Sequence, residues 1–112
     1  MIEAYRFGSY IIDGQEYRWD IKIFNKRVEQ WEGREGHNIF VKDIEDILER
    51  KPAYIVIGTG ASGLVKVDDE VKKIAEENNI RLIIEKTPVA VEEFNRLQKE
   101  GKDVCAIMHG TC

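Results

Sequence analysis

A length of 112 residues and a hydrophobic content of 43% predict one globular domain, residues 1–112, with a core of its own. The net charge of −4 and the absence of a basic stripe argue against a nucleic-acid partner. No apolar run approaches the roughly 20 residues that span a bilayer, and no secretory signal follows Met1, so we expect a cytoplasmic protein without membrane association.

Residues 5–31 have the pattern of an antiparallel β-meander. Apolar and polar residues alternate from Glu16 to Ile23, which predicts a strand with one buried face. Asp13-Gly14 precedes this stretch and predicts a hairpin turn, because both residues tolerate positive φ. Asn25-Lys26 predicts a second turn, which leads into a further strand at 28–31.

From residue 43 onward, apolar runs alternate with helical patterns. Asp43 is placed to cap a short helix that ends before Pro52, and Asp68 and Thr87-Pro88 mark two further helix starts. The apolar runs are nearly continuous, as in strands that are covered on both faces. The expected strands are 53–57, 80–84 and 104–108, and the expected helices are 43–50, 69–78 and 88–100.

This element order predicts an α/β fold of three layers: helices, a mixed central sheet with a βαβαβ unit, and an N-terminal antiparallel meander. Right-handed crossovers make the three late strands parallel, so their carboxyl ends share one edge of the sheet. Open α/β sheets bind ligands at that edge. We therefore expect residues 58–63, 85–87 and 109–112 to lie together there.

The stretch Gly58-Thr59-Gly60-Ala61-Ser62-Gly63 matches G-x-G-x-x-G, and Glu85 ends the next expected strand. A dinucleotide site needs a helix that begins inside the glycine run, so that its N–H groups face the pyrophosphate. Residues 64–67 instead have the pattern of extended chain, and the next helix begins with the acidic residues 68–70. No Lys-Ser/Thr pair follows Gly63, which also argues against a P-loop. We expect no cofactor.

A site for a smaller anion is the functional interpretation that we retain for this edge. The expected helix 88–100 offers free backbone N–H groups at its start, and Thr87 adds a hydroxyl. In the alternative interpretation the glycines only make a turn and the hydroxyls cap backbone groups. The candidate ligand-binding residues are Gly58, Thr59, Gly60, Ser62, Gly63, Thr87 and His109.

Cys105, His109 and Cys112 have the spacing C-x₃-H-x₂-C. An extended strand places Cys105 and His109 on one face and Cys112 on the other, so we expect no metal site. Cys105 lies in mid-strand, where a buried thiol is inert. His109 could transfer a proton or contact an anion, but we favour a strand-end histidine that is hydrogen-bonded to backbone. We assign no catalytic residue.

Tyr17, Trp19 and Trp31 are the aromatic residues of the predicted meander. We expect them to form core between the two sheets. If the small sheet is partly uncovered, they would instead form an aromatic contact patch of the kind found at interaction hot spots.

Four ordered motifs resemble the Mth938-domain family of small single-domain proteins, and together they extend over nearly the whole chain. They are Gly14-x-x-Tyr17-x-x-Asp20-Ile21, Ile-Gly-Thr-Gly-x-x-Gly at 57–63, Thr-Pro-x-Ala-Val-x-x-Phe-Asn at 87–95 and His-x-Thr-Cys at 109–112. The family usually has Tyr-Asn where this chain has Phe94-Asn95, so one hydroxyl is missing. Asn95 itself either reaches a neighbouring backbone group or faces water.

The resemblance implies a single Mth938-like domain with the family's own three-layer α/β fold, and no established catalytic activity or cofactor. The family includes an adipogenesis-associated protein and a mitochondrial assembly factor for respiratory complex I. This favours a non-enzymatic interaction or assembly module with an unidentified protein partner, and leaves self-association open. The alternative function is a small-anion or metabolite-binding protein, or an enzyme, that uses the crevice at the strand ends.

Overall fold

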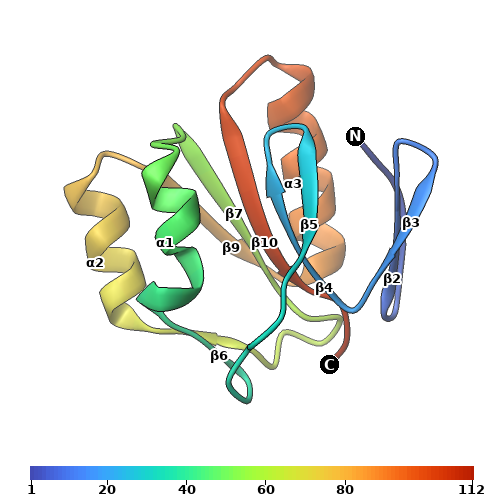
Figure 1. Ribbon diagram of the computed structural model, residues 1–112, viewed down its shortest axis with the longest axis horizontal. Helices are drawn as coiled ribbons and strands as arrows, with labels where there is room; N and C mark the ends of the chain where they lie inside the picture. The colour runs from blue at the N-terminus through green and yellow to red at the C-terminus, as the bar shows by residue number, and fades with distance from the viewer.

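The computed structural model describes residues 1–112 and contains three sheets and three helices (Figure 1). The first sheet consists of β1 (Ile2–Arg6), β2 (Ser9–Ile12) and β3 (Gln15–Arg18). The central sheet has the order β5 (Arg27–Gln30), β4 (Asp20–Phe24), β10 (Val104–His109), β7 (Tyr54–Thr59) and β9 (Arg81–Glu85). The remaining elements are β6 (Asn38–Ile39), β8 (Lys66–Val67), α1 (Val41–Glu49), α2 (Asp69–Glu77) and α3 (Thr87–Lys99).

The late strands run parallel, as the crossover rule predicts. β10 pairs with β7 and β7 with β9 in parallel, whereas β4 is antiparallel to both β10 and β5. The register places His109 opposite Thr59 on one side and opposite Asp20 on the other. The expected α/β fold with a mixed central sheet is confirmed, and three carboxyl strand ends lie along one edge.

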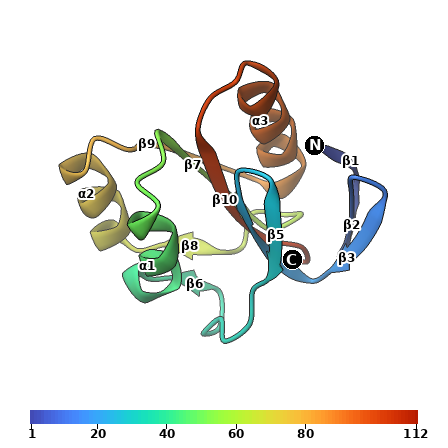
Figure 2. The same cartoon turned by 45° about the horizontal axis from the view of Figure 1, so that its top comes forward.

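Helices cover both faces of the central sheet. α1 and α2 pack on one face, while α3 and the three-stranded sheet pack on the other (Figures 1 and 2). Side chains of β7 and β10 alternate between two buried clusters, because successive residues of a strand point to opposite faces. Val56 and Met108 face α3, and Ile57 and Ile107 face α1 and α2. None of the three helices is long and apolar enough to cross a membrane.

The segment from Glu16 to Ile23 is not one strand, which corrects the sequence interpretation. Trp19 has a φ of 68° and separates β3 from β4, so that Tyr17 belongs to the small sheet and Ile21 to the central one. The three aromatic residues do not together form core between the two sheets, as we expected. Trp31 is buried in the cluster on the α1 and α2 side of the central sheet. Tyr17 packs against the cluster on the α3 side, and Trp19 is 58% exposed.

The expected turns are confirmed, since Asp13, Gly14 and Asn25 all have positive φ. Asp43 is not the N-cap of α1 as expected. It is the third helical residue, and its carboxylate accepts a hydrogen bond from the Phe40 N–H at 2.8 Å. The short pair β6 and β8 is an element that the sequence interpretation did not include. β8 confirms that the chain after the glycine loop is extended rather than helical.

Candidate functional site

The glycine loop, the start of α3 and the end of β10 meet through one buried hydroxyl. Thr87 Oγ1 accepts a hydrogen bond from the Gly60 N–H at 2.9 Å and donates one to the His109 carbonyl at 2.6 Å. Thr59 Oγ1 donates to the Glu85 carbonyl at 3.2 Å. Ser62 lies exposed in the same loop. The structure therefore brings the sequence-predicted residues to one edge of the sheet.

Gly58 and Gly63 have close neighbours that explain the absence of a side chain. A methyl group at Gly58 would lie 2.8 Å from Thr87 Oγ1, and one at Gly63 would lie 3.1 Å from Cγ of Lys86. Gly63 also has a φ of 76°, where an L side chain is strained. Both glycines thus serve the close packing of the loop against the start of α3.

Residues 110–112 cover the glycine loop. The N–H groups of Ala61 and Leu64 donate to the carbonyls of Thr111 and Cys112, each at 3.2 Å. A methyl group at Gly60 would lie 2.6 Å from the Thr111 carbonyl oxygen. Two of the loop N–H groups that could bind an anion therefore already donate hydrogen bonds to carbonyls of the chain itself. Anion binding here stays a prediction, and it requires that the 110–112 segment move away.

A chain of polar side chains holds the 110–112 segment in place. His109 is 1% exposed, and its Nδ1 lies 2.6 Å from Oδ1 of Asp20. Oδ2 of Asp20 accepts a hydrogen bond from Nε of Arg34 at 3.1 Å, and Nε2 of His109 lies 3.2 Å from Oγ1 of Thr111. The Gly110 N–H also donates to Asp20 at 3.2 Å. The histidine partner is thus a carboxylate rather than the backbone that we favoured.

Asp20, His109 and Thr111 are arranged in space like a hydrolytic triad, in which a carboxylate orients a histidine beside a hydroxyl. The three cavities of the molecule are lined by other residues, so none of them offers a substrate site beside Thr111. The contacts fix the backbone after β10 instead. We assign this group of side chains a positioning role.

Two tyrosines lie beneath Gly110. Tyr5 Oη donates to the Gly110 carbonyl at 2.7 Å, and the Gly8 N–H donates to the same oxygen at 2.7 Å. The Tyr10 hydroxyl is fully buried and has no hydrogen-bond partner. Burial raises the pKa of Tyr10 well above its ordinary value, and the nearby Tyr5 and Asp20 raise it further.

The cysteines do not join this group. Cys105 is buried in mid-strand, and burial raises the pKa of its thiol, which keeps it protonated and unreactive at neutral pH. No group of three His, Cys, Asp or Glu side chains is close enough together to hold a metal ion.

Three large apolar side chains are exposed at residues that contact the 110–112 segment or, for Phe7, that precede such a residue. We call Phe7, Trp19 and Leu64 the aromatic patch. Their exposed fractions are 66%, 58% and 53%. A methyl group at Gly8, which follows Phe7, would lie 3.2 Å from the Trp19 ring and 3.6 Å from Cγ2 of Thr111. Leu64 is connected to the same segment by the hydrogen bond from its backbone N–H to the Cys112 carbonyl.

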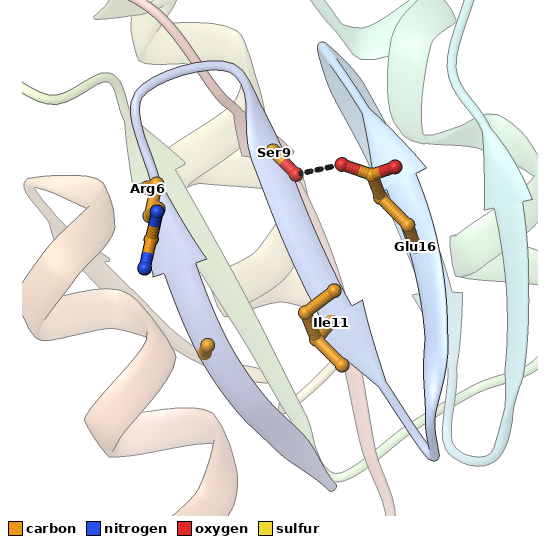
Figure 3. Close-up of a pocket in the computed structure, with 5 residues that line it drawn as sticks. Arg6, Ser9, Ile11 and Glu16 are labelled. Atoms are coloured by element: carbon orange, nitrogen blue, oxygen red, sulfur yellow. Dashed lines mark hydrogen bonds between the residues drawn. The ribbon is translucent and has the colours of Figure 1, made fainter.

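The outer face of the three-stranded sheet carries a shallow concavity of about 260 Å³ (Figure 3). Ala4 and Ile11 form part of its lining, and Ser9 Oγ donates to Oε2 of Glu16 at 2.8 Å across it. Ser9 and Glu16 thus already bind each other, and Arg6 is the one lining residue whose polar group is left to contact a ligand.

The sequence interpretation missed Asp20, Arg34 and Tyr10 as parts of this region. One signal was available for Asp20, because a carboxylate directly before the apolar run of β4 needs a polar partner once it is partly buried. Nothing in the sequence around Arg34 indicates that it binds Asp20, 14 residues earlier. Nothing around Tyr10 indicates that its hydroxyl lies next to Gly110.

Comparison with known proteins supports a family assignment. The chain matches over residues 2–109 the family model described as a protein of unknown function (DUF498/DUF598). It is 30% identical to a conserved hypothetical protein of Pyrococcus horikoshii OT3, with a TM-score of 0.88 and coverage of 100% of this chain and 99% of that one. It is 28% identical to the protein MT938, with a TM-score of 0.83 and coverage of 100% and 98%.

A more distant structure extends the same likeness of fold. A Mth938-like domain of Bordetella pertussis is 15% identical, with a TM-score of 0.65 and coverage of 98% of this chain and 85% of that one. The expected resemblance is therefore confirmed: this chain belongs to the Mth938-like family, for which no activity is established.

Proposed function

We propose that this protein is a non-enzymatic interaction module that binds a protein partner through the aromatic patch. The observation that carries the proposal is Trp19, which combines a left-handed backbone with a side chain that is 58% exposed. A bulky residue at positive φ is unfavourable by about 1–3 kcal/mol, and such strain persists mainly at functional sites.

Folding alone gives little reason for a tryptophan at this position. Its exposed side chain contributes only part of the stabilisation that full burial would supply. Glycine or asparagine would adopt the same backbone at lower cost. A partner surface gives the reason, because tryptophan is enriched among the residues that dominate binding energy.

The backbone presents Trp19 rigidly. Its N–H donates to the Gly8 carbonyl at 2.9 Å, and its carbonyl packs so closely on Gly110 that a methyl group there would lie 2.0 Å away. A side chain on a fixed backbone loses less conformational entropy when it binds than one on a mobile loop. The positioning role of Asp20 and His109 fits this interpretation, since they fix Gly110.

The test replaces Trp19 by alanine and compares it with Val89→Ala, which removes an exposed apolar side chain from α3. Affinity purification from the native organism under mild lysis should recover a stoichiometric partner with the wild type and Val89→Ala, but not with Trp19→Ala. A photo-crosslinking residue at position 19, and not at 89, should become joined to that partner. Loss of the partner with both variants, or no partner at all, contradicts the proposal.

The convergence of Gly58, Thr87 and His109 supports a second candidate function, binding of a small anion or metabolite at the strand ends. The glycine loop would open only if residues 110–112 moved away. A ligand at 100 times its Kd would stabilise the fold by about 2.7 kcal/mol. Thermal unfolding with a panel of phosphates and carboxylates tests this function, and the absence of any shift across the panel contradicts it.

A further inference from the structure

We propose that a cleft at the other end of β10 binds a small amphipathic anion, namely an aliphatic monocarboxylate. The cleft has a volume of about 540 Å³. It lies where the last turns of α3, the turn between β4 and β5 and the start of the chain come together. Its lining residues are Met1, Lys26, Asn95, Gln98 and Lys99.

Specific hydrogen bonds build the walls of this cleft. Asn95 of α3 accepts from the Ile2 N–H and donates to the Ile2 carbonyl, both at 2.8 Å, and so fixes β1. Gln98 donates to the Asn25 carbonyl at 2.7 Å and so fixes the β4–β5 turn. The Asn25 N–H is in turn bound to the Val104 carbonyl at 3.0 Å. The cleft is therefore formed before any ligand arrives.

The hydrogen bond between Gln98 and Asn25 also places two positive charges at the cleft. Lys99 follows Gln98 and Lys26 follows Asn25, so one hydrogen bond brings two lysines to the same cleft. No carboxylate is among the lining residues, and neither lysine has an ion-pair partner within 4.0 Å.

Two like charges beside one cleft repel each other, and an anion between them relieves that repulsion. The cleft is thus locally positive on a protein whose net charge is −4. This contrast favours an anionic ligand over a neutral or cationic one.

The walls favour a ligand with an apolar part. Lysine stems pack along apolar groups while the ammonium stays in water, and Met1 adds a further apolar side chain. The volume lies within the roughly 300–1,000 Å³ range of small-molecule sites. The side-chain amides of Asn95 and Gln98 are already bound to backbone, which leaves the lysines as the polar contacts. A carboxylate with a short alkyl chain fits this combination, and the inference does not depend on the aromatic patch.

The test titrates the full chain with octanoate, and in separate arms with acetate and octylamine. Octanoate and octylamine are kept below their micellar concentrations. NMR follows the side-chain amides of Asn95 and Gln98. Octanoate should shift these signals with saturation, acetate should bind far more weakly because it lacks the alkyl chain, and octylamine should not bind. The variant Lys26→Gln/Lys99→Gln should bind octanoate roughly tenfold more weakly, because two exposed charged contacts are lost.

A control variant, Lys66→Gln/Lys73→Gln, makes the same change in net charge at exposed positions outside the cleft. It should bind octanoate as the wild type does. All four lysines are exposed, so both variants should fold. The proposal is overturned if octanoate leaves the two amides unmoved, if octylamine binds equally well, or if the control loses as much affinity as the cleft variant.

Discussion

The two ends of β10 differ in how their polar groups are satisfied. At the carboxyl end, Thr87 and His109 bind groups of the chain itself, and residues 110–112 cover the glycine loop. At the amino end, Lys26 and Lys99 line an open cleft without a carboxylate. The rule for open α/β sheets points to the carboxyl end for ligands. In this protein that end is internally closed, and a cleft of about 540 Å³ lies at the other end.

Substitution of Gly110 should have the largest effect on the closed end. In Gly110→Ala, the new methyl group would lie 2.0 Å from the Trp19 carbonyl oxygen, a backbone atom that cannot rotate away. We expect the free energy of unfolding to fall by more than about 3 kcal/mol, the upper range for overpacking. Urea denaturation measures it.

Gly33→Ala serves as the control for Gly110→Ala, because nothing lies within 4 Å of Gly33 and only its positive φ opposes a side chain. It should cost about 1 kcal/mol. Equal effects of the two substitutions would show that the contact between Gly110 and Trp19 does not hold the end closed.

The Thr87 hydroxyl should have the next largest effect. Thr87→Val keeps the shape of the side chain but leaves the Gly60 N–H and the His109 carbonyl without this partner in a buried place. We expect a loss of about 2–4 kcal/mol, since each unsatisfied buried group costs about 1–3 kcal/mol. Thr87→Ser keeps the hydroxyl and should lose less than half as much. Hydrogen exchange of the Gly60 amide, faster in Thr87→Val alone, locates the effect.

The two tyrosines beneath Gly110 should respond with opposite signs. Tyr5→Phe removes a hydrogen bond to the Gly110 carbonyl and should lower the free energy of unfolding by about 1 kcal/mol. Tyr10→Phe removes a buried hydroxyl that has no partner and should raise it by about 1 kcal/mol at pH 7. Chemical denaturation of both variants decides this. A loss in Tyr10→Phe would show that its hydroxyl does have a partner, such as a bound water.

The same tyrosine predicts an alkaline limit to stability. Burial raises the pKa of Tyr10 in the folded protein, so above pH ~10 the unfolded chain loses the phenolic proton while the folded chain keeps it. The unfolded state is thereby favoured, and stability should fall by up to about 1.4 kcal/mol per pH unit. Below pH ~10 this contribution stays constant. Tyr10→Phe should flatten the decline, and an unchanged slope would contradict the assignment to Tyr10.

The open end should be the most tolerant. Gln98→Ala removes a partly exposed hydrogen bond to the Asn25 carbonyl, and water can replace the lost donor. We expect a loss of less than about 1 kcal/mol. A larger loss in denaturation would show that both ends of β10 depend equally on internal hydrogen bonds, and the contrast between them would then fail.

Sequence reasoning succeeded where the evidence was local. The continuous apolar runs at 53–57, 80–84 and 104–108 identified three buried strands, and the crossover rule made them parallel. Asp13-Gly14 identified a hairpin because its backbone requirement is carried by the two turn residues themselves. Even the meeting of Thr87 with the glycine loop followed from strand direction alone.

It failed where a residue's environment is made by distant parts of the chain. Trp19 continues an alternating pattern that predicts burial, but its place between two sheets leaves it exposed. Asp20 meets His109 across 89 residues of sequence, and Gln98 meets Asn25 across 73, so no local pattern indicates either contact. Periodicity determines which face of an element is apolar, and thereby the elements and their order. Only the packing of the whole chain decides which distant groups come into contact. These contacts close the carboxyl end of β10 and leave a positively charged cleft at its amino end.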